Sequence, residues 1–293
     1  MQASLLAVLA HPDDEALRCG GTLARAAAQG ADVTLICLTR GEAGRNTDPT
    51  LTVTDMGEQR EQELRQACAH LGIHPPVFLG YHDSGRGDRL RQGDPLASIN
   101  ADPLDIEARI LAVIRRVNPQ VMLTFDPHGM YGHPDHLVAH RAATAAFSSA
   151  ANHGVPVQRL YYAAQTHEEM RHLQGGPFTR TSAAPELRSG PGLGVLNGLD
   201  PDTYAVSPCS VAARIDVRAY AAQKLAALRA HRSQTGPMST LGTLSDAQIR
   251  PLLEHETFSL GGLRSPLLEY PTSDLFSGLN VHYRPVRPAA STP

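Results

Sequence analysis

The sequence predicts an α/β fold: a Rossmann-like, doubly wound and mainly parallel sheet with a long irregular insertion and a smaller C-terminal portion. Short apolar runs alternate with longer helix-forming segments over the first 170 residues, which is the pattern of repeated β-α units. The runs are continuous rather than alternating, as expected for parallel strands that are covered on both faces. Two of the runs are followed by clusters of His and Asp, and α/β proteins bind ligands at the carboxyl ends of parallel strands.

The expected strands in this part of the chain are short runs rich in Leu, Ile, Val, Phe or Tyr. They are predicted at Leu5–Leu9, Val33–Thr39, Val77–Leu79, Val121–Phe125 and Arg159–Ala164. Helices are predicted between them, at Arg18–Gln29, Gly57–His70, Pro103–Val117 and Asp135–Ala150. Capping residues support these limits, because Thr54 or Asp55 can begin the second helix while Gly30 and Gly72 follow the first and second.

The remainder of the chain is less regular. From about Gly175 to Pro208 it is rich in Gly, Pro, Ser and Thr, so we expect a long ordered loop or lid. Beyond it we expect a strand and two helices, at Val211–Val217, Arg218–His231 and Leu244–Leu253. The Pro-rich tail from Arg284 is expected to fray. Residues 1–170 are thus predicted to form the catalytic core, and residues 171–293 an insertion and a C-terminal portion packed on the same domain.

Composition points to a folded protein that binds a small molecule. The chain has 293 residues, 42% of them hydrophobic and 19% charged, which suits a sizeable core and argues against disorder. A net charge of −3 without a basic run gives no electrostatic footprint for nucleic acid or an anionic membrane. We therefore expect a small-molecule partner, and a homo-oligomer is compatible with this composition.

Cysteine usage and the start of the chain predict a cytoplasmic location. Cys19, Cys37, Cys68 and Cys209 are widely spaced without a CxxC pair, which is typical of reduced thiols. The first strand is predicted within a few residues of Met1, which leaves no room for a secretory leader. No apolar stretch approaches the roughly 18 residues of a membrane span.

The first polar cluster comes directly after the first predicted strand. His11 and Asp14 are three residues apart across a strand-to-helix turn, so both side chains can face one point while Asp13 points elsewhere into the same pocket. Zinc and similar ions are held by His and carboxylate, and a catalytic site uses only three protein ligands. This cluster supplies part of such a set.

The second cluster follows the fourth predicted strand. His133 and His136 lie on either side of Pro134 and Asp135, at the start of a helix, and on spacing alone either histidine can be a ligand. Acidic residues that merely complement helix dipoles would explain the carboxylates, but not the histidines beside them. We therefore predict one metal site assembled from both clusters.

Other polar residues are candidates for substrate binding. Arg40 and Glu42 lie in the loop after the second strand, and Asp83 follows the third. Arg60 shares a helix with Glu63, and an ion pair between these two is the alternative to substrate contact. His231 and Gln234, near a helix end, are read from the pattern alone as a surface patch. A nucleotide site is not predicted, because the glycines after the first strand lack the G-x-G-x-x-G spacing.

These motifs together resemble the LmbE-like, GlcNAc-phosphatidylinositol de-N-acetylase superfamily over about residues 4–165. The resemblance rests on residues 10–15 (AHPDDE), 20–23 (GGTL), 38–44 (LTRGEAG), 60–64, 81–85 (YHDSG) and 131–136 (YGHPDH). With Ala230-His231-Arg232-Ser233-Gln234, the chain is most similar to the mycothiol and bacillithiol deacetylases and the mycothiol S-conjugate amidases. The resemblance implies a cytosolic, zinc-dependent amide hydrolase with a Rossmann-like fold.

The resemblance also implies a role for each residue of the clusters. The metal ligands would be His11, Asp14 and His136, and Asp13 would be the general base on the water held by the metal. His133 would stabilise the oxyanion, Asp135 would keep His133 protonated and oriented, and Tyr131 would polarise the substrate carbonyl. Metal coordination lowers the pKa of bound water toward ~7, and a cationic imidazole at the developing oxyanion supplies charge where the transition state needs it.

The implied reaction is hydrolysis of an N-acetyl group from an N-acetylglucosamine-containing metabolite of low-molecular-weight thiol biosynthesis. An amidase that removes a larger acyl group from a glucosaminyl thiol S-conjugate is the alternative enzyme. A non-catalytic carbohydrate-binding module is the alternative of a different class. Zn²⁺ is the expected metal, and Fe²⁺ is the other candidate because two His and one carboxylate also suit non-haem iron.

Overall fold

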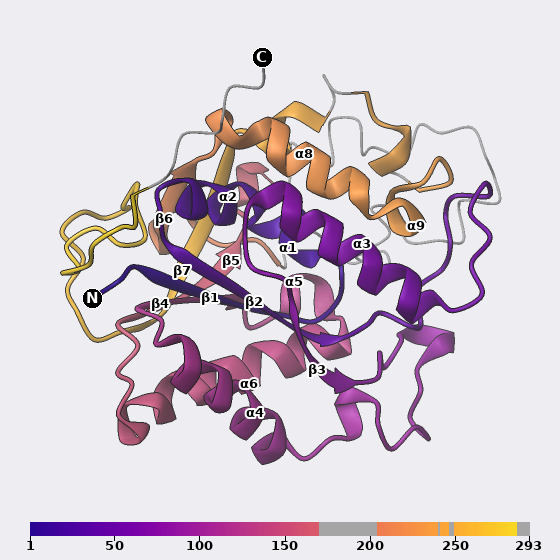
Figure 1. The fold of residues 1–293 in the computed structure, drawn as a ribbon, viewed down its shortest axis with the longest axis horizontal. Coiled ribbons are helices and arrows are strands. Elements are labelled where there is room, and N and C mark those ends of the chain that lie inside the picture. The colour runs from indigo at the N-terminus through magenta and orange to yellow at the C-terminus, as the bar shows by residue number, and fades with distance from the viewer. Residues whose placement is uncertain (170–203, 240, 246–248, 286–293) are drawn as a thin grey trace.

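A computed structural model describes residues 1–169, 204–239, 241–245 and 249–285, and its centre is a seven-stranded sheet (Figure 1). The strands are β1 (Ser4–Leu9), β2 (Asp32–Thr39), β3 (Val77–Tyr81), β4 (Val121–Phe125), β5 (Arg159–Ala164), β6 (Val211–Asp216) and β7 (His255–Leu263). Their order is β3-β2-β1-β4-β5-β7-β6. Neighbouring strands from β3 to β5 pair in parallel, whereas β7 is antiparallel to both β5 and β6. The predicted mainly parallel α/β fold is thus confirmed.

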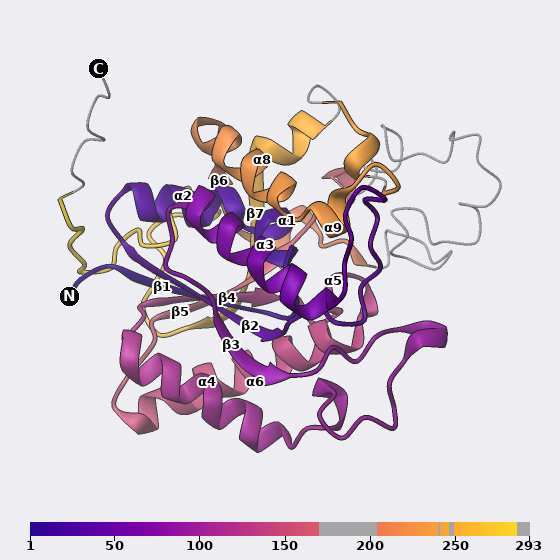
Figure 2. The ribbon, with the colours of Figure 1, turned by 45° about the vertical axis from the view of Figure 1, so that its right-hand side comes forward.

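Helices cover both faces of the sheet (Figures 1 and 2). One layer holds α1 (Asp14–Arg18), α2 (Gly20–Ala28), α3 (Met56–Leu71), α8 (Ala221–Ala230) and α9 (Arg232–Thr235). The opposite layer holds α4 (Pro103–Val117) and α6 (Pro134–Ala150), and the short α5 (Gly129–Gly132) leads into α6. The 3₁₀ helices are η1 (Gly87–Arg89), η2 (Ser98–Asn100), η3 (Ala151–His153), η6 (Pro208–Ser210), η7 (Arg218–Tyr220), η8 (Leu241–Thr243) and η9 (Arg250–Leu253). No helix in the described ranges is long and apolar enough to cross a membrane.

Local sequence signals set the ends of the long helices. The Asp55 carboxylate accepts the Glu58 N–H at 2.9 Å and so begins α3, which ends at Gly72 with a φ of 70°. The Asp102 carboxylate begins α4 in the same way, with Pro103 in its first turn. Such caps satisfy backbone groups that have no partner within the helix. The predicted limits of both helices are therefore close to the observed ones.

The helix expected at Arg18–Gln29 is α2, which begins two residues later at Gly20, and the short helix α1 before it was not predicted. The chain leaves α1 at Cys19, where φ is −145°, and starts again as α2. Glu256 explains the new start, because its carboxylate accepts the backbone N–H groups of Gly21 and Thr22 at 2.8 and 2.7 Å. A residue more than 230 positions away thus supplies the helix cap, and no local pattern shows it.

The sequence did not predict β7, whose segment ends in two glycines instead of a run of branched residues. A Cβ at Gly262 would lie 2.3 Å from the Phe147 ring, so the strand can pass this ring only with glycine there.

Two predicted helices in the C-terminal part differ in detail. η7 precedes α8 where one helix was expected, and Arg250–Leu253 is a 3₁₀ helix within the predicted helix Leu244–Leu253. Of the predicted loop Gly175–Pro208, the part before residue 204 lies outside the described residues, as does the tail from residue 286.

The strand order places the ends of β1 and β4 at the centre of the sheet. From β1 the chain moves outward to β2 and β3, and then returns to the other side of β1 as β4. Such a reversal leaves a crevice at the carboxyl ends of the two strands, which is where open α/β sheets bind ligands. Both polar clusters of the sequence follow these two strands.

Candidate metal centre and active site

The two sequence clusters meet at the ends of β1 and β4, as predicted. His11 and Asp14 come from the turn after β1, and His133, Asp135 and His136 come from the start of α6. All five are buried, with exposed fractions of 7% or less. The α6 N-terminus is fixed by Pro134 and by His133, whose Nδ1 accepts the Asp135 backbone N–H at 3.2 Å.

His11, Asp14 and His136 form a triangle of ligand atoms. His11 Nδ1 lies 3.2 Å from His136 Nε2, which lies 3.3 Å from Asp14 Oδ1, and Asp14 Oδ2 is 3.6 Å from His11 Nδ1. Tetrahedral bonds of zinc to nitrogen and oxygen imply ligand atoms about 3.3–3.4 Å apart. The two histidine nitrogens are therefore spaced as two ligands of one ion, and a different oxygen of the Asp14 carboxylate, which forms the third corner, faces each of them.

The other ring nitrogen of each triangle histidine has an acceptor of its own. His11 Nε2 lies 2.9 Å from Asp135 Oδ2, and His136 Nδ1 lies 3.1 Å from the Gly129 carbonyl oxygen. When both rings are neutral and carry their protons on those nitrogens, His11 Nδ1 and His136 Nε2 are unprotonated acceptors that face each other and the Asp14 carboxylate. Three acceptors without a proton between them repel one another unless a cation lies among them, so the donor set fits a metal ion.

Asp135 occupies a different place from the expected one. Its carboxylate was expected to orient His133, but it contacts His11 Nε2 and accepts the Ser98 hydroxyl and the Ser84 N–H. A carboxylate behind a ligating histidine fixes the ring and its tautomer. In this structure Asp135 therefore holds the ring of His11, one of the predicted ligands.

His133 lies beside the triangle. Its ring centroid is 4.5 Å from that of His11 and 4.9 Å from that of His136, and the three histidines have ligand atoms within 4.8 Å of one another. Burial and the neighbouring imidazoles of His11 and His136 lower the pKa of His133 to about 2. Both effects favour the neutral ring, and the protonated His133 that the resemblance implies stays a prediction. Because Nδ1 accepts the Asp135 N–H, the proton lies on Nε2.

The His11 ring is held between carboxylates. Burial alone would lower its pKa, but Asp83, 3.5 Å from Nε2, and Asp135 raise the pKa well above the ordinary value. The same contact acts on Asp83, because His11 and Arg60 hold the pKa of this carboxyl well below its usual range although burial raises it. The two carboxylates thus favour a positive charge at the His11 ring, carried either by a second proton or by a metal ion at Nδ1.

Asp13 lies next to the triangle in a strained backbone conformation. Its φ is 109° and its ψ is −27°, a region that residues with a Cβ rarely adopt and that is concentrated at functional sites. The side chain is one-third exposed, and one oxygen lies 3.1 Å from the Arg60 guanidinium. Desolvation raises the pKa of Asp13 to about 6, against the opposing effect of Arg60.

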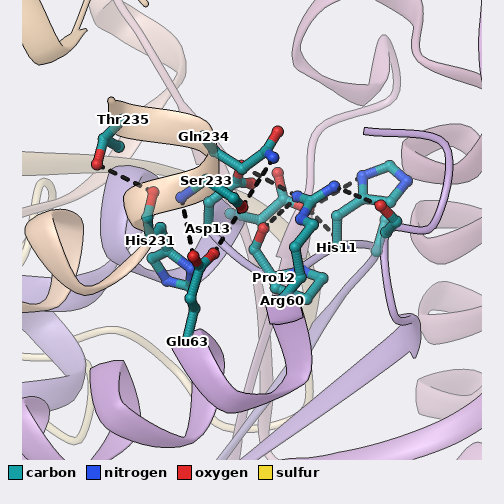
Figure 3. Close-up of polar contacts among 12 residues, drawn as sticks. His11, Pro12, Asp13, Arg60, Glu63, His231, Ser233, Gln234 and Thr235 are labelled. Carbon is teal, nitrogen blue, oxygen red and sulfur yellow. Dashed lines mark hydrogen bonds and ion pairs between the residues drawn. The ribbon is translucent and has the colours of Figure 1, made fainter. Parts of the chain in front are cut away.

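Arg60 contacts protein atoms on three sides. Besides Asp13, its guanidinium donates to the carbonyl oxygens of Pro12 and Gly41 at 2.5 and 2.9 Å (Figure 3). The side chain is 4% exposed. Arg60 thus pairs with Asp13, whereas the Glu63 carboxylate binds Ser233, and contact of Arg60 with substrate stays a prediction.

Tyr131 lies in an irregular turn between β4 and α6. Its φ is −156° inside α5, and the preceding Met130 has a φ of 67°. The ring centroid is 5.1 Å from that of His136 and 6.0 Å from that of His133, with Arg86 on its face. Burial raises the pKa of the Tyr131 hydroxyl, so it stays protonated and can donate a hydrogen bond.

The other predicted substrate residues differ in exposure. Asp83 is 4% exposed and accepts the N–H groups of Gly85 and Ala43. Glu42 accepts the Asp83 N–H at 3.0 Å and lies 3.4 Å from Arg40 Nε. The Arg40 side chain is 37% exposed, so it is the most accessible of the predicted substrate residues.

Sequence reasoning missed a buried pair behind the site. His231 was expected on the surface, but it is fully buried and its Nε2 lies 2.7 Å from Glu15 Oε1. Ser233 and Glu63 form a second buried contact beside it. The sequence signal for these contacts was the motif at residues 230–234. Helix spacing alone does not show that its side chains are buried.

The comparisons with known proteins agree with this geometry. Residues 6–147 match the GlcNAc-PI de-N-acetylase family (PIG-L). A 1D-myo-inositol 2-acetamido-2-deoxy-alpha-D-glucopyranoside deacetylase of Thermobifida fusca is 37% identical over 277 residues, covering 87% of this chain and 92% of its own. The enzyme of the same name from Rhodococcus opacus is 38% identical over 297 residues, covering 94% and 98%.

A solved structure has a similar fold over most of the chain. The crystal structure of a conserved protein from Thermus thermophilus aligns with a TM-score of 0.56 and 26% identity, covering 93% of this chain and 99% of its own. Together with the two deacetylases, this similarity extends beyond the catalytic core into the C-terminal part. The chain belongs to the GlcNAc-PI de-N-acetylase (PIG-L, LmbE-like) family.

Proposed function

We propose that this protein is a metal-dependent deacetylase that hydrolyses the N-acetyl group of an N-acetylglucosamine-containing small metabolite. The observation that carries the proposal is the triangle of acceptors His11, Asp14 and His136, with the Asp13 carboxylate beside it. The names of the deacetylase relatives support the reaction type and the amino-sugar substrate. A cytoplasmic location remains our prediction.

The ligands of the proposed metal are His11, Asp14 and His136. A divalent ion held by them would lower the pKa of a bound water toward ~7 and polarise the substrate carbonyl. We favour Zn²⁺ because two histidine nitrogens and a carboxylate are a common ligand set for this ion, with Fe²⁺ as the alternative. Elemental analysis of protein purified without oxygen decides between the two metals.

Asp13 is the proposed general base. Its carboxylate is outside the triangle, is partly open to solvent, and has its pKa raised to about 6. A base whose pKa lies near neutrality can both accept the proton of the attacking water and release it later to the amine. The Arg60 contact holds the carboxylate in one orientation while this proton moves.

His133 and Tyr131 are the proposed donors to the developing oxyanion. The neutral His133 ring offers its Nε2–H, since Nδ1 is occupied by the Asp135 N–H, and Tyr131 offers its hydroxyl. Donors placed in a buried site stabilise such charge more strongly than water does. Arg40, together with Glu42, is proposed to contact the sugar or its aglycone.

A metal-dependence and substrate screen tests this proposal. Purified protein is assayed for release of a primary amine from N-acetylglucosaminyl inositol, N-acetylglucosaminyl malate and an S-conjugated cysteinyl glucosaminide. Deacetylation that is lost on chelation and restored by metal supports the proposal. Turnover of the S-conjugate alone would identify an amidase for larger acyl groups, and sugar binding without any turnover would identify a carbohydrate-binding module.

A further inference from the structure

The C-terminal segment reaches the active site through a buried pair. His231, at the end of α8, lies 2.7 Å from Glu15 of α1, although 216 residues separate them in the chain. Both side chains are fully buried. The Nδ1 of His231 has no hydrogen-bond partner within the described part of the chain, so contact with Glu15 is the one polar contact that the structure gives this ring.

The second carboxylate oxygen of Glu15 holds the backbone of Asp13. Glu15 Oε2 accepts the Asp13 N–H at 3.1 Å, and Asp13 is the residue with a φ of 109°. A strained backbone conformation persists only where the surroundings determine it from several sides. Glu15 therefore connects the imidazole of His231 with the strained peptide of Asp13.

Further contacts hold both Asp13 and the segment that carries His231. Arg60 binds the Asp13 carboxylate and the Pro12 carbonyl oxygen. The segment that carries His231 is fixed to α3, because Ser233 donates both its N–H and its hydroxyl to the Glu63 carboxylate at 2.8 and 2.7 Å (Figure 3). His231 thus contacts Glu15 from a rigid support.

We propose that His231 is a positioning residue that acts through Glu15 to hold Asp13 in the conformation required for proton transfer. The proposal rests on the function proposed above for Asp13. The polar contact that the structure gives the His231 ring is with Glu15 and not with His11, Asp14 or His136. Its removal is therefore expected to reduce the rate of the chemical step and to leave metal and substrate binding intact.

Two variants of similar size test this role. His231→Gln keeps a donor at the distance of Nε2, whereas the amide of His231→Asn is too short to reach Glu15. In the metal-loaded enzyme we expect His231→Asn to lower kcat by about tenfold or more, as loss of a hydrogen bond to a charged group does. Its KM and metal content should stay at the wild-type values, and His231→Gln should restore most of kcat.

A matched control separates positioning from general destabilisation. Lys224→Met removes the donor of another buried pair of the same length, Lys224–Glu256 at 2.7 Å, which does not contact Asp13. We expect its kcat to remain near the wild-type value. An equal loss of kcat in Lys224→Met and His231→Asn, or an unchanged kcat in His231→Asn, would overturn the proposal.

The backbone of Asp13 provides a readout that is independent of activity. In crystal structures, φ at Asp13 should stay positive in the wild type and in His231→Gln and become negative in His231→Asn. An unmoved Asp13 in His231→Asn refutes the proposal even if kcat falls. If His231→Asn does not fold, Glu15→Asp replaces it as the test variant. This change keeps the charge but makes the side chain too short to reach both His231 and the Asp13 N–H, so φ at Asp13 should again become negative.

These measurements also distinguish the two proposals from each other. A wild-type protein without deacetylase activity on any substrate of the screen would refute the proposed function, while the Asp13 conformation would still report on the contact from His231 through Glu15. An active wild type with unaffected variants would refute only the role of His231.

Discussion

Asp13 differs from its neighbours in the HPDD motif because it does not belong to the triangle of ligand atoms. Its side chain is the more exposed one and its partner is Arg60, whereas Asp14 faces His11 and His136. Two adjacent carboxylates can hold such different positions because of the positive φ at Asp13, which turns successive side chains in different directions. The motif would therefore separate the proposed metal binding by Asp14 from the proposed proton transfer by Asp13 within one turn of the chain.

This separation predicts different results for substitutions in the motif. Asp13→Asn keeps the shape of the side chain and removes its basicity, so kcat should fall by about 10²–10⁴-fold, the usual contribution of a general base. The metal content should not change, because Asp13 is not a ligand. Activity assays and elemental analysis of the same preparation measure both quantities.

His11→Ala is the control for this variant. It removes a corner of the triangle and should lose metal and activity together. If Asp13→Asn remained fully active, another group would have to take the proton.

Asp135 gives a second prediction at this scale. Its carboxylate lies 2.9 Å from His11 Nε2 and is fully buried, so it should control the metal affinity through His11. Asp135→Asn should weaken metal binding by about 10–100-fold, as loss of such an outer contact typically does. Competition with a chromophoric chelator measures the dissociation constant.

The expected role of Asp135 in orienting His133 leads to a different result. In that case Asp135→Asn would lower kcat in the metal-saturated enzyme without a change in metal affinity. The Ser98 hydroxyl, which also contacts this carboxylate, offers a milder comparison. Ser98→Ala leaves the charge in place and should affect the metal affinity less.

At the scale of the elements, Glu256 of β7 explains why α1 and α2 are separate. Its carboxylate caps α2 through two backbone N–H groups and pairs with Lys224 of α8 at 2.7 Å. Both side chains of the pair are 2% exposed. One carboxylate therefore joins a helix start, a strand and a second helix that lie far apart in the sequence.

Breaking this pair should destabilise the fold and leave the chemistry intact. Lys224→Met leaves the Glu256 charge buried without its cation, which typically costs about 3–5 kcal/mol. Urea unfolding followed by circular dichroism measures the loss of unfolding free energy. Arg218→Ala removes the cation of an exposed pair with Asp216, and as a matched control it should change stability little.

The glycines of β7 give another prediction at this scale. A Cβ at Gly262 would meet the Phe147 ring at 2.3 Å, so Gly262→Ala must move either the strand or α6. We expect a loss of about 1–3 kcal/mol of stability, the usual cost of overpacking, visible as a lower Tm. Gly93→Ala is the control, because no atom lies within 4 Å of a Cβ at that position.

The strands of the sheet differ in how well the sequence predicted them. The strands β1, β2, β4 and β5 were predictable because each is a continuous apolar run buried on both faces. The two polar clusters were predictable because they follow such runs directly. In contrast, β7 has no apolar pattern, and its glycines are explained only by rings from β5 and α6.

The sequence also did not predict which partners the individual site residues contact. Asp135 and Arg60 were placed at the site, but their contacts with His11 and with the Pro12 carbonyl depend on distances between elements that no spacing in the sequence encodes. From the pattern alone His231 was read, with Gln234, as part of a surface patch, yet its ring is fully buried and contacts Glu15 of α1.

For the whole molecule, Arg159 joins the C-terminal segment to the sheet. It is fully buried at the start of β5, and its guanidinium donates to the carbonyl oxygens of Pro266, Leu275 and Ser277. A buried charge is costly unless hydrogen bonds compensate it. These carbonyl groups would in turn be buried without their donor if the guanidinium were removed.

Arg159→Met should therefore loosen the C-terminal segment more than the active site. The variant keeps an apolar stem of similar length but leaves three carbonyl oxygens without their donor, so local opening of residues 264–279 should become easier. Hydrogen exchange followed by mass spectrometry should show faster exchange there than in β1, with kcat close to the wild-type value. Uniformly faster exchange would show instead that the segment and the sheet unfold as one cooperative unit, with Arg159 contributing to global stability alone.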